Sequence, residues 1–206
     1  MKYCHYVTLK DGHRCVIRNA EATDAQEVLD VMQRAHVQTD FLRSYPNEMA
    51  IDVEQERSWL SERLESEREI ELVGVVDGVI VGSAGVEEVG TTSKVWHRAE
   101  LGISVIRQYW GIGIGGALID ACIACATAAE YSQLELQVVA DNARALALYT
   151  KRGFVEYGRN PRGFLSCVSG YQELVYMRRE LDDPAARVGT VVAEELECVS
   201  HGDGTL

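Results

Sequence analysis

The first part of the chain has its apolar residues at helical spacing. Between residues 28 and 35 they lie three or four positions apart, which predicts an amphipathic helix. Thr23 precedes Gln26 by three residues, a pairing that resembles a capping box, so we expect the helix to begin there. A second amphipathic helix is expected over residues 53–69, and its many Glu and Arg side chains are interpreted as a solvated face.

Two runs rich in β-branched residues, 70–76 and 79–86, are separated by Asp77 and Gly78. Both turn residues tolerate positive φ, so the pair is a strong signal for a tight hairpin turn. An antiparallel hairpin is therefore expected over residues 70–86.

The other short apolar runs predict strands interspersed with helices. These strands are expected at residues 15–18, 99–105, 134–139, 154–157 and 171–181. A glycine-rich loop leads from the strand at 99–105 into a helix that ends near residue 128, and a further helix is expected over residues 141–152 with Asp141 as its N-cap. This order of elements predicts an α/β fold.

Length and charge limit the class of protein. A chain of 206 residues with 47% hydrophobic and 25% charged residues fits one globular domain, expected over residues 1–181. Residues 182–206 carry six acids and one base without apolar periodicity, and are expected to form a flexible acidic tail. The net charge of −12 argues against nucleic acid as a partner, since binding its phosphates depends on excess Lys and Arg.

No apolar stretch approaches the ~20 residues that a membrane span requires, so no membrane association is expected. The first residues lack the apolar segment of a secretion signal, which makes the cytoplasm the expected compartment. The six cysteines are too few and too scattered for a disulfide scaffold and are expected to be free thiols. Cys122 and Cys125 have no second Cys or His pair to complete a zinc site, so no metal is expected.

Gly111, Gly113 and Gly116 match the dinucleotide-binding pattern G-x-G-x-x-G. That reading is disfavoured, because the loop follows at least the fourth strand and the next strand does not end in an acid. A P-loop is excluded, since no Gly-Lys-Ser/Thr follows the glycines. Four glycines in six residues at a strand-to-helix junction leave backbone N–H groups uncovered at the positive end of a helix dipole, which favours a diphosphate site.

Two separated segments, residues 103–118 and 140–154, together resemble the GNAT superfamily of acetyl-CoA-dependent N-acetyltransferases. They are most similar to bacterial members related to ribosomal-protein-alanine and polyamine acetyltransferases. The resemblance implies a mixed, mostly antiparallel sheet of six to seven strands, flanked by helices, in which one pair of parallel strands splays apart. It also implies acetyl-CoA as co-substrate.

The resemblance assigns cofactor contacts residue by residue. The backbone of Ile103, Ser104 and Val105 would pair with the pantetheine arm. Amides of the glycine loop would hold the pyrophosphate, from Gly111, Ile112, Gly113, Ile114, Gly115 and Gly116, and Asn142 would face the cofactor. The family's loop signature begins with Gln or Arg. In one frame that position is Trp110, in the overlapping frame it is Gln108, and both frames remain open.

Acetylation of an amine requires a base for the amine and a proton for the departing thiolate. The resemblance gives the acid role to Tyr149, whose ordinary pKa near 10 would suit it. Some relatives carry a Glu where this chain has Gln137, so Glu100 is the substitute candidate for the base and His97 a weaker one. Surface positions without a catalytic role remain the alternative for both.

The sequence thus predicts an N-acetyltransferase that moves the acetyl group from acetyl-CoA to a primary amine by direct attack in a ternary complex. The acceptor would be a small molecule, a polyamine, or a protein N-terminus or lysine, and the acidic balance weakly favours cationic amines. A homodimer is possible. Two alternatives remain: a non-catalytic acyl-CoA-binding regulatory module of the same fold, and a nucleotide-binding protein.

Overall fold

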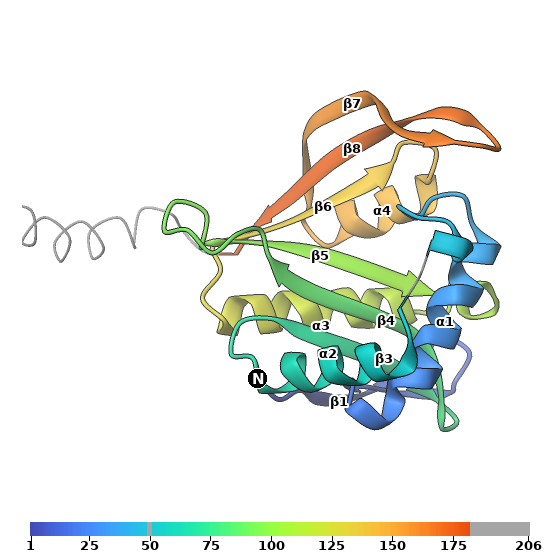
Figure 1. The fold of residues 1–206 in the computed structure, drawn as a ribbon, viewed down its shortest axis with the longest axis vertical. Helices are drawn as coiled ribbons and strands as arrows, with labels where there is room; N and C mark the ends of the chain where they lie inside the picture. The colour runs from blue at the N-terminus through green and yellow to red at the C-terminus, as the bar shows by residue number, and fades with distance from the viewer. Residues whose placement is uncertain (49–50, 182–206) are drawn as a thin grey trace, which may run out of the picture.

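The computed structural model describes residues 1–48 and 51–181. Their strands form one sheet in the order β1-β2-β3-β4-β5-β6-β8-β7 (Figure 1). The strands are β1 Cys4–Thr8, β2 Arg14–Asn19, β3 Ile70–Val76, β4 Val79–Glu88, β5 Arg98–Val105, β6 Gln133–Val139, β7 Val155–Ser166 and β8 Gly170–Glu180. The helices are α1 Ala25–Gln38, α2 Val53–Glu65, α3 Ile114–Ala128 and α4 Ala143–Lys151, with short 3₁₀ turns at Ala22–Asp24, Pro46–Glu48 and Arg107–Tyr109.

Every neighbouring pair of strands is antiparallel except β5 and β6, which run parallel. The expected mixed, mostly antiparallel sheet is confirmed. The sheet has eight strands, one more than the expected upper number, because β1 pairs with β2 at its edge. Most of β1 is exposed, so no alternation of apolar and polar residues announces it in the sequence.

Helices cover both faces of the sheet. α1 and α2 pack on one face of β3, β4 and β5, and α3 packs on the other face of the same strands (Figure 1). α4 lies beside α3, since Arg152 just after α4 donates to the backbone oxygen of Gly116 at 3.1 Å. The core fills the space between these layers, and α3 is buried on several sides, with Leu118, Ile119 and Cys122 fully enclosed.

Two helix starts differ from the sequence prediction. The proposed capping box of Thr23 and Gln26 is wrong: Glu21 and Asp24 form the box, around a 3₁₀ turn, and α1 follows at Ala25. Asp24 is fixed there because its carboxylate accepts the Glu21 N–H at 2.8 Å and two hydrogen bonds from the Arg18 guanidinium.

The N-cap of α4 is Asn142 rather than Asp141. The Asn142 side chain accepts the N–H of Ala145 at 3.2 Å, and the helix begins at residue 143.

The second helix is shorter than expected, since α2 ends at Glu65 and not at residue 69.

Cys4, Cys15, Cys122, Cys125 and Cys167 are free thiols, as expected. Within the described residues, no helix is long and apolar enough to span a lipid bilayer. The acidic segment 182–206, with Cys198, lies outside the described residues, and its flexibility stays a prediction.

Candidate active site

The parallel strands β5 and β6 separate after three paired residues. Residues 98–100 of β5 pair with residues 133–135 of β6, whereas residues 101–105 are paired with β4 and residues 136–139 with β8. The facing edges of the two strands therefore leave backbone N–H and C=O groups without a partner strand. A groove of about 1500 Å³ runs through this opening, larger than the ~300–1,000 Å³ of most small-molecule pockets.

The glycine loop borders this groove. Gly111, with a φ of 85°, and Gly113, with a φ of 119°, hold backbone conformations that favour glycine, and Gly113 is the N-cap of α3. The first backbone bond of the helix runs from the Ala117 N–H to the Gly113 oxygen at 3.0 Å. The N–H groups of the residues between them have no acceptor within the helix, so they can bind an anion at its positive end.

The loop positions differ in what they contribute. Gly111, Gly113, Gly115 and Gly116 line the groove, as expected of cofactor-binding residues, and Ile103, Ser104, Val105 and Asn142 line it too. Ile114 is instead fully buried in the core, and Ile112 packs against that core while its backbone oxygen accepts the Lys10 N–H at 2.9 Å. These two isoleucines can therefore serve the loop through their backbone, not their side chains.

Trp110 closes the end of β5. Its indole Nε1 donates to the backbone oxygen of Val105 at 2.5 Å, and the guanidinium groups of Arg107 and Arg144 lie 5.5 and 5.3 Å from the centre of its ring. Because left-handed backbone occurs at Gly111 and Gly113, the frame that begins at Gln108 fits the loop better than the one that begins at Trp110.

Cations gather around the loop. The guanidinium of Arg144 lies 3.8 Å from the point where a Cβ of Gly111 would stand, and Arg152 lies against Gly116. Arg144, Arg152, Lys10 and Lys151 all line the groove. Arg144 lies in residues 140–154, one of the two segments that carried the resemblance, but the sequence analysis did not assign it a role. Its position beside the glycines depends on how α4 packs next to the loop.

Tyr149 lines the groove from α4. Its side chain is 8% exposed and its ring packs edge-on against Phe154, with centroids 5.9 Å apart. Burial raises the pKa of Tyr149 to about 12, above the ordinary value assumed from the sequence. No other group in the described part of the chain hydrogen-bonds its hydroxyl, which leaves that hydroxyl available to a ligand.

Glu100 lies on β5 where the strands begin to separate, and it lines the groove. The Gln137 side chain on β6 donates to its carboxylate at 3.2 Å. Gln137 therefore positions Glu100 across the opening, although it cannot accept a proton itself. His97 does not line the groove, and its backbone oxygen accepts the N–H groups of Ser132 and Gln133.

Glu71 on β3 is a groove residue that the sequence analysis missed. Burial raises its pKa to about 8, and the nearby carboxylates of Glu56 and Glu87 add to the rise, against a hydrogen bond from Ser83. Glu71 pairs with Gly85 on β4, where a Cβ would collide with its carboxylate. The available signal was a lone acid in the apolar run of residues 70–76.

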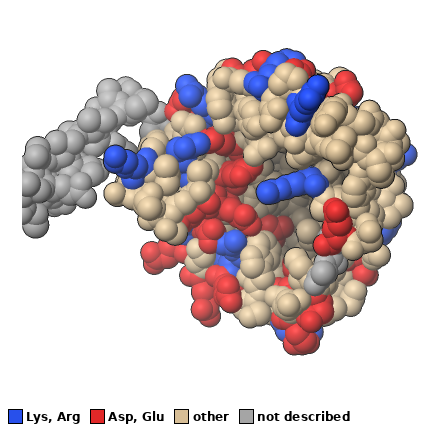
Figure 2. All heavy atoms as spheres, turned by 45° about the horizontal axis from the view of Figure 1, so that its top comes forward, with Lys and Arg blue, Asp and Glu red and all other residues tan. Residues whose placement is uncertain are grey.

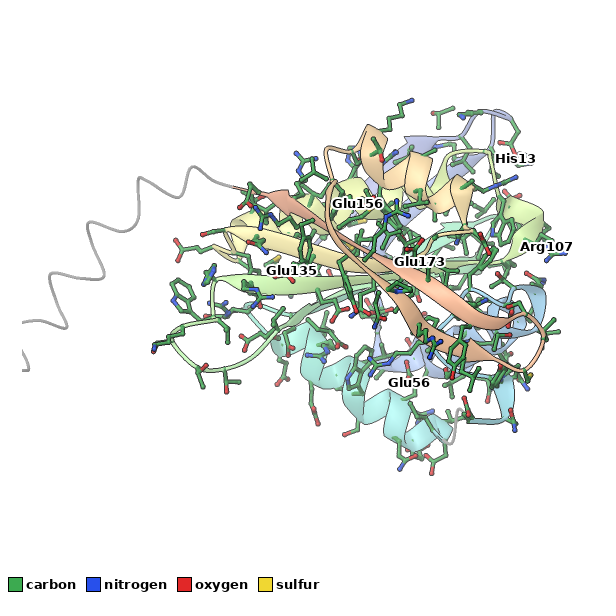
Figure 3. The ribbon with its side chains drawn as sticks, turned by 90° about the horizontal axis from the view of Figure 1, so that it is seen from above. His13, Glu56, Arg107, Glu135, Glu156 and Glu173 are labelled. Atoms are coloured by element: carbon green, nitrogen blue, oxygen red, sulfur yellow. The ribbon has the colours of Figure 1, made fainter. Side chains whose placement is uncertain are left out.

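Glu56 is the second missed residue. Its exposed fraction is 4%, it lines the groove, and its Oε1 has no hydrogen-bond partner. Figure 3 shows it on α2, on the side of the helix that faces the sheet. Burial raises the pKa of Glu56. The charges of this helix therefore do not all form a solvated face, because Glu56 shares the buried stripe of Leu60.

Cys122 and Cys125 lie in the core side of α3, 0% and 3% exposed, and burial raises the pKa of Cys125 to about 11. Across residues 1–48 and 51–181 no group of three or more His, Cys, Asp or Glu side chains is arranged to hold a metal ion. The absence of a metal thus stays a prediction.

The model of the acetyltransferase (GNAT) family matches residues 33–154, more than half of the chain. The chain belongs to this family. The resemblance seen in the glycine loop and in residues 140–154 is confirmed at this level, and the chain is an acyltransferase with a GNAT fold.

Relatives of this GNAT chain cover most of its length. An Escherichia coli protein named L-amino acid N-acetyltransferase is 30% identical over 80% of this chain and 96% of its own. A GNAT-family acetyltransferase structure from Streptococcus pneumoniae is 28% identical, with a TM-score of 0.77 over 81% of this chain and 99% of that one. A Salmonella typhimurium protein solved with its cofactor acetyl-CoA has the same fold, with a TM-score of 0.75 at 20% identity, covering 83% of this chain and 96% of that one.

Proposed function

We propose that this protein transfers the acetyl group of acetyl-CoA to a primary amine by direct attack in a ternary complex. The observation that carries the proposal is the opening between β5 and β6, which has a glycine-lined helix N-terminus beside it. Membership of the GNAT family and the E. coli relative, named as an amino acid N-acetyltransferase, support it. The acetyl-CoA in the Salmonella relative supports the choice of donor.

The glycine-loop end of the groove would hold the diphosphate. The N–H groups at the start of α3 have no acceptor within the helix, and the Arg144 guanidinium adds positive charge beside Gly111; Arg152, which lies against Gly116, is paired with Asp120 at 3.0 Å. The pantetheine arm would lie along residues 103–105, whose edge toward β6 has no partner strand and offers hydrogen bonds in the manner of an added strand, with the Val105 oxygen already accepting one from the Trp110 indole. Asn142 would line the same groove in a fixed orientation, because its side chain caps α4.

The thioester would then lie between Glu100 and Tyr149. A neutral amine forms a bond to the carbonyl carbon, and the carbon–sulfur bond breaks as the tetrahedral intermediate collapses. The amine gives up one proton, which Glu100 accepts directly or through water and passes to solvent. The thiolate leaves with a hydrogen bond from the Tyr149 hydroxyl and takes a proton from water, so charge and protons balance.

Binding and turnover can be tested separately. Calorimetric titration with acetyl-CoA is expected to show binding to the parent protein and none to Gly113→Glu, which places a carboxylate at the phosphate site. Gly78→Glu is the matched control, since Gly78 also has a positive φ of 81° but lies in the β3–β4 turn. Equal binding by Gly113→Glu would refute the loop assignment.

A thiol-release assay over a panel of amines then decides whether the protein is catalytic. Release of CoA thiol that depends on an added amine supports acetyl transfer. Binding of acetyl-CoA with no release for any amine would favour the non-catalytic acyl-CoA-binding module instead.

A further inference from the structure

One end of the groove is acidic and lies on a single face of the sheet. Glu71 of β3 is opposite Gly85 of β4, and Gly85 is opposite Gly102 of β5. One row along, Glu87 is opposite Glu100. Since residues two apart on a strand share a face, both rows project into the same side of the groove. Figure 2 shows acidic side chains gathered along one side of the hollow on this face.

Glu71 and Glu100 of this face, together with Glu56 of α2 above it, have no ion-pair partner in the described part of the chain. Among the described residues, no Lys, Arg or His forms an ion pair with Glu56, Glu71 or Glu100. The charge of Arg63 acts on Glu71, but the Arg63 side chain pairs with Glu69 and, at 3.3 Å, with Glu87. Burial without an ion-pair partner raises the pKa of Glu56 and of Glu71 and so favours their neutral forms, whereas an ammonium group bound beside them would favour the carboxylates.

Glu56 is independent evidence for a ligand. Its exposed fraction is 4%, it lines the groove, and its Oε1 has no hydrogen-bond partner among the described residues. Buried carboxylate oxygens in folded proteins are almost always hydrogen-bonded. The missing donor would be supplied by a group that enters from the groove.

The walls around the acids suit an alkyl chain. Met32 and Trp59 are apolar residues of the groove lining, and a Cβ on Gly102 would meet nothing within 4 Å, so the floor there is open. Four of the basic residues that line the groove come instead from the glycine-loop end and α4, namely Lys10, Arg144, Lys151 and Arg152. The fifth, Arg43, is an exposed side chain on the half-buried loop after α1. The groove is therefore polarised, with cations where phosphates would bind and acids beyond the reaction centre.

We propose that the acceptor is an alkyl diamine or polyamine, whose second ammonium group is held by Glu56 and Glu71. This inference rests on the proposed acetyl transfer. One amine of the acceptor is neutral and attacks the thioester beside Glu100. The other stays charged and donates to the unpartnered Glu56 Oε1, and its positive charge favours the ionised form of Glu71, while the methylene chain crosses the open floor at Gly102. An α-amino acid is a poor fit, because its carboxylate would face the same acids.

The test compares 1,4-diaminobutane and 1,5-diaminopentane with butylamine, pentylamine and an α-amino acid, by thiol release from acetyl-CoA. The parent protein is expected to favour each diamine over its monoamine in kcat/KM by about tenfold or more, as hydrogen bonds between charged groups allow. Glu71→Gln and Glu56→Gln are each expected to bring this ratio toward one. Glu54→Gln, on the exposed side of the same helix and paired with Arg57, is expected to keep the parent ratio.

The outcomes separate this inference from the proposed function. Equal use of diamines and monoamines, a preference for the α-amino acid, or an unchanged ratio in Glu71→Gln would overturn the diamine assignment and leave acetyl transfer standing. If no amine releases thiol, acetyl transfer fails, and calorimetry with CoA present decides the inference. Diamine binding about tenfold tighter than monoamine binding, lost in Glu71→Gln, would then support it, and equal affinity would overturn it. Glu71→Gln gives the answer even if Glu56→Gln does not fold.

Discussion

Replacing Tyr149 with Phe tests the leaving-group side of the reaction. The change removes the hydroxyl and keeps the ring, so the edge-on contact with Phe154 at 5.9 Å and the packing of α4 are preserved. The pKa of Tyr149 is about 12, and a cysteine thiol, the nearest model for the CoA sulfur, has a pKa of ~8.5. Full proton transfer from this phenol to the thiolate is therefore uphill by ~5 kcal/mol.

The size of the expected effect follows from that comparison. Tyr149 is expected to stabilise the leaving sulfur by a hydrogen bond rather than by giving up its proton. Hydrogen bonds to charged groups contribute about 1.5–3 kcal/mol, which corresponds to a loss of about 10- to 150-fold in kcat. The KM for acetyl-CoA should change little, since the bond strengthens only as negative charge develops on sulfur.

Steady-state kinetics with saturating amine measures both constants. Tyr131→Phe is the matched control, because Tyr131 is also buried but does not line the groove. A Tyr149→Phe protein with the parent kcat would remove the residue from the mechanism. A loss near 10⁴-fold, the upper range for general acid catalysis, would show that the hydroxyl does transfer its proton and that the hydrogen-bond account is mistaken.

Two further predictions concern the strands that build the groove. Gly82→Ala would place a Cβ 2.7 Å from the Ser104 oxygen, so the end of β5 must shift. We expect the free energy of unfolding to fall by about 1–3 kcal/mol in thermal unfolding and the KM for acetyl-CoA to rise. Gly158→Ala is the control and should change neither, since its Cβ would have its nearest neighbour at 3.7 Å. Because the pKa of Glu71 is raised from 4.5 to about 8, unfolding releases its proton between these values and stability falls as pH rises through that window. Glu71→Gln should flatten this dependence in denaturant titrations, and an unchanged slope would contradict the raised pKa.

Local chemistry in the sequence was enough to predict most elements. The hairpin at residues 70–86 depends on a two-residue turn, and the loop at Gly111–Gly116 depends on backbone that only glycine adopts easily, so neighbouring residues decide both. The edge strand β1 was missed because most of it is exposed and only its pairing with β2 defines it. The cap before α1 was assigned to Thr23 and Gln26 rather than to Glu21 and Asp24, because Arg18, whose side chain fixes Asp24, comes from β2.

The sequence by itself determined the order of strands and helices after β1, the glycine loop and the family, since these follow from spacing and residue type within short segments. The tertiary structure alone decided where β5 and β6 part, and that Glu56, Glu71 and Arg144 meet the same groove from three different elements. A side chain's burial and neighbours depend on packing between segments far apart in the chain. For that reason Glu56, which the sequence places on a solvated helix face, is a buried acid without a hydrogen-bond partner for its Oε1 in the described part of the fold.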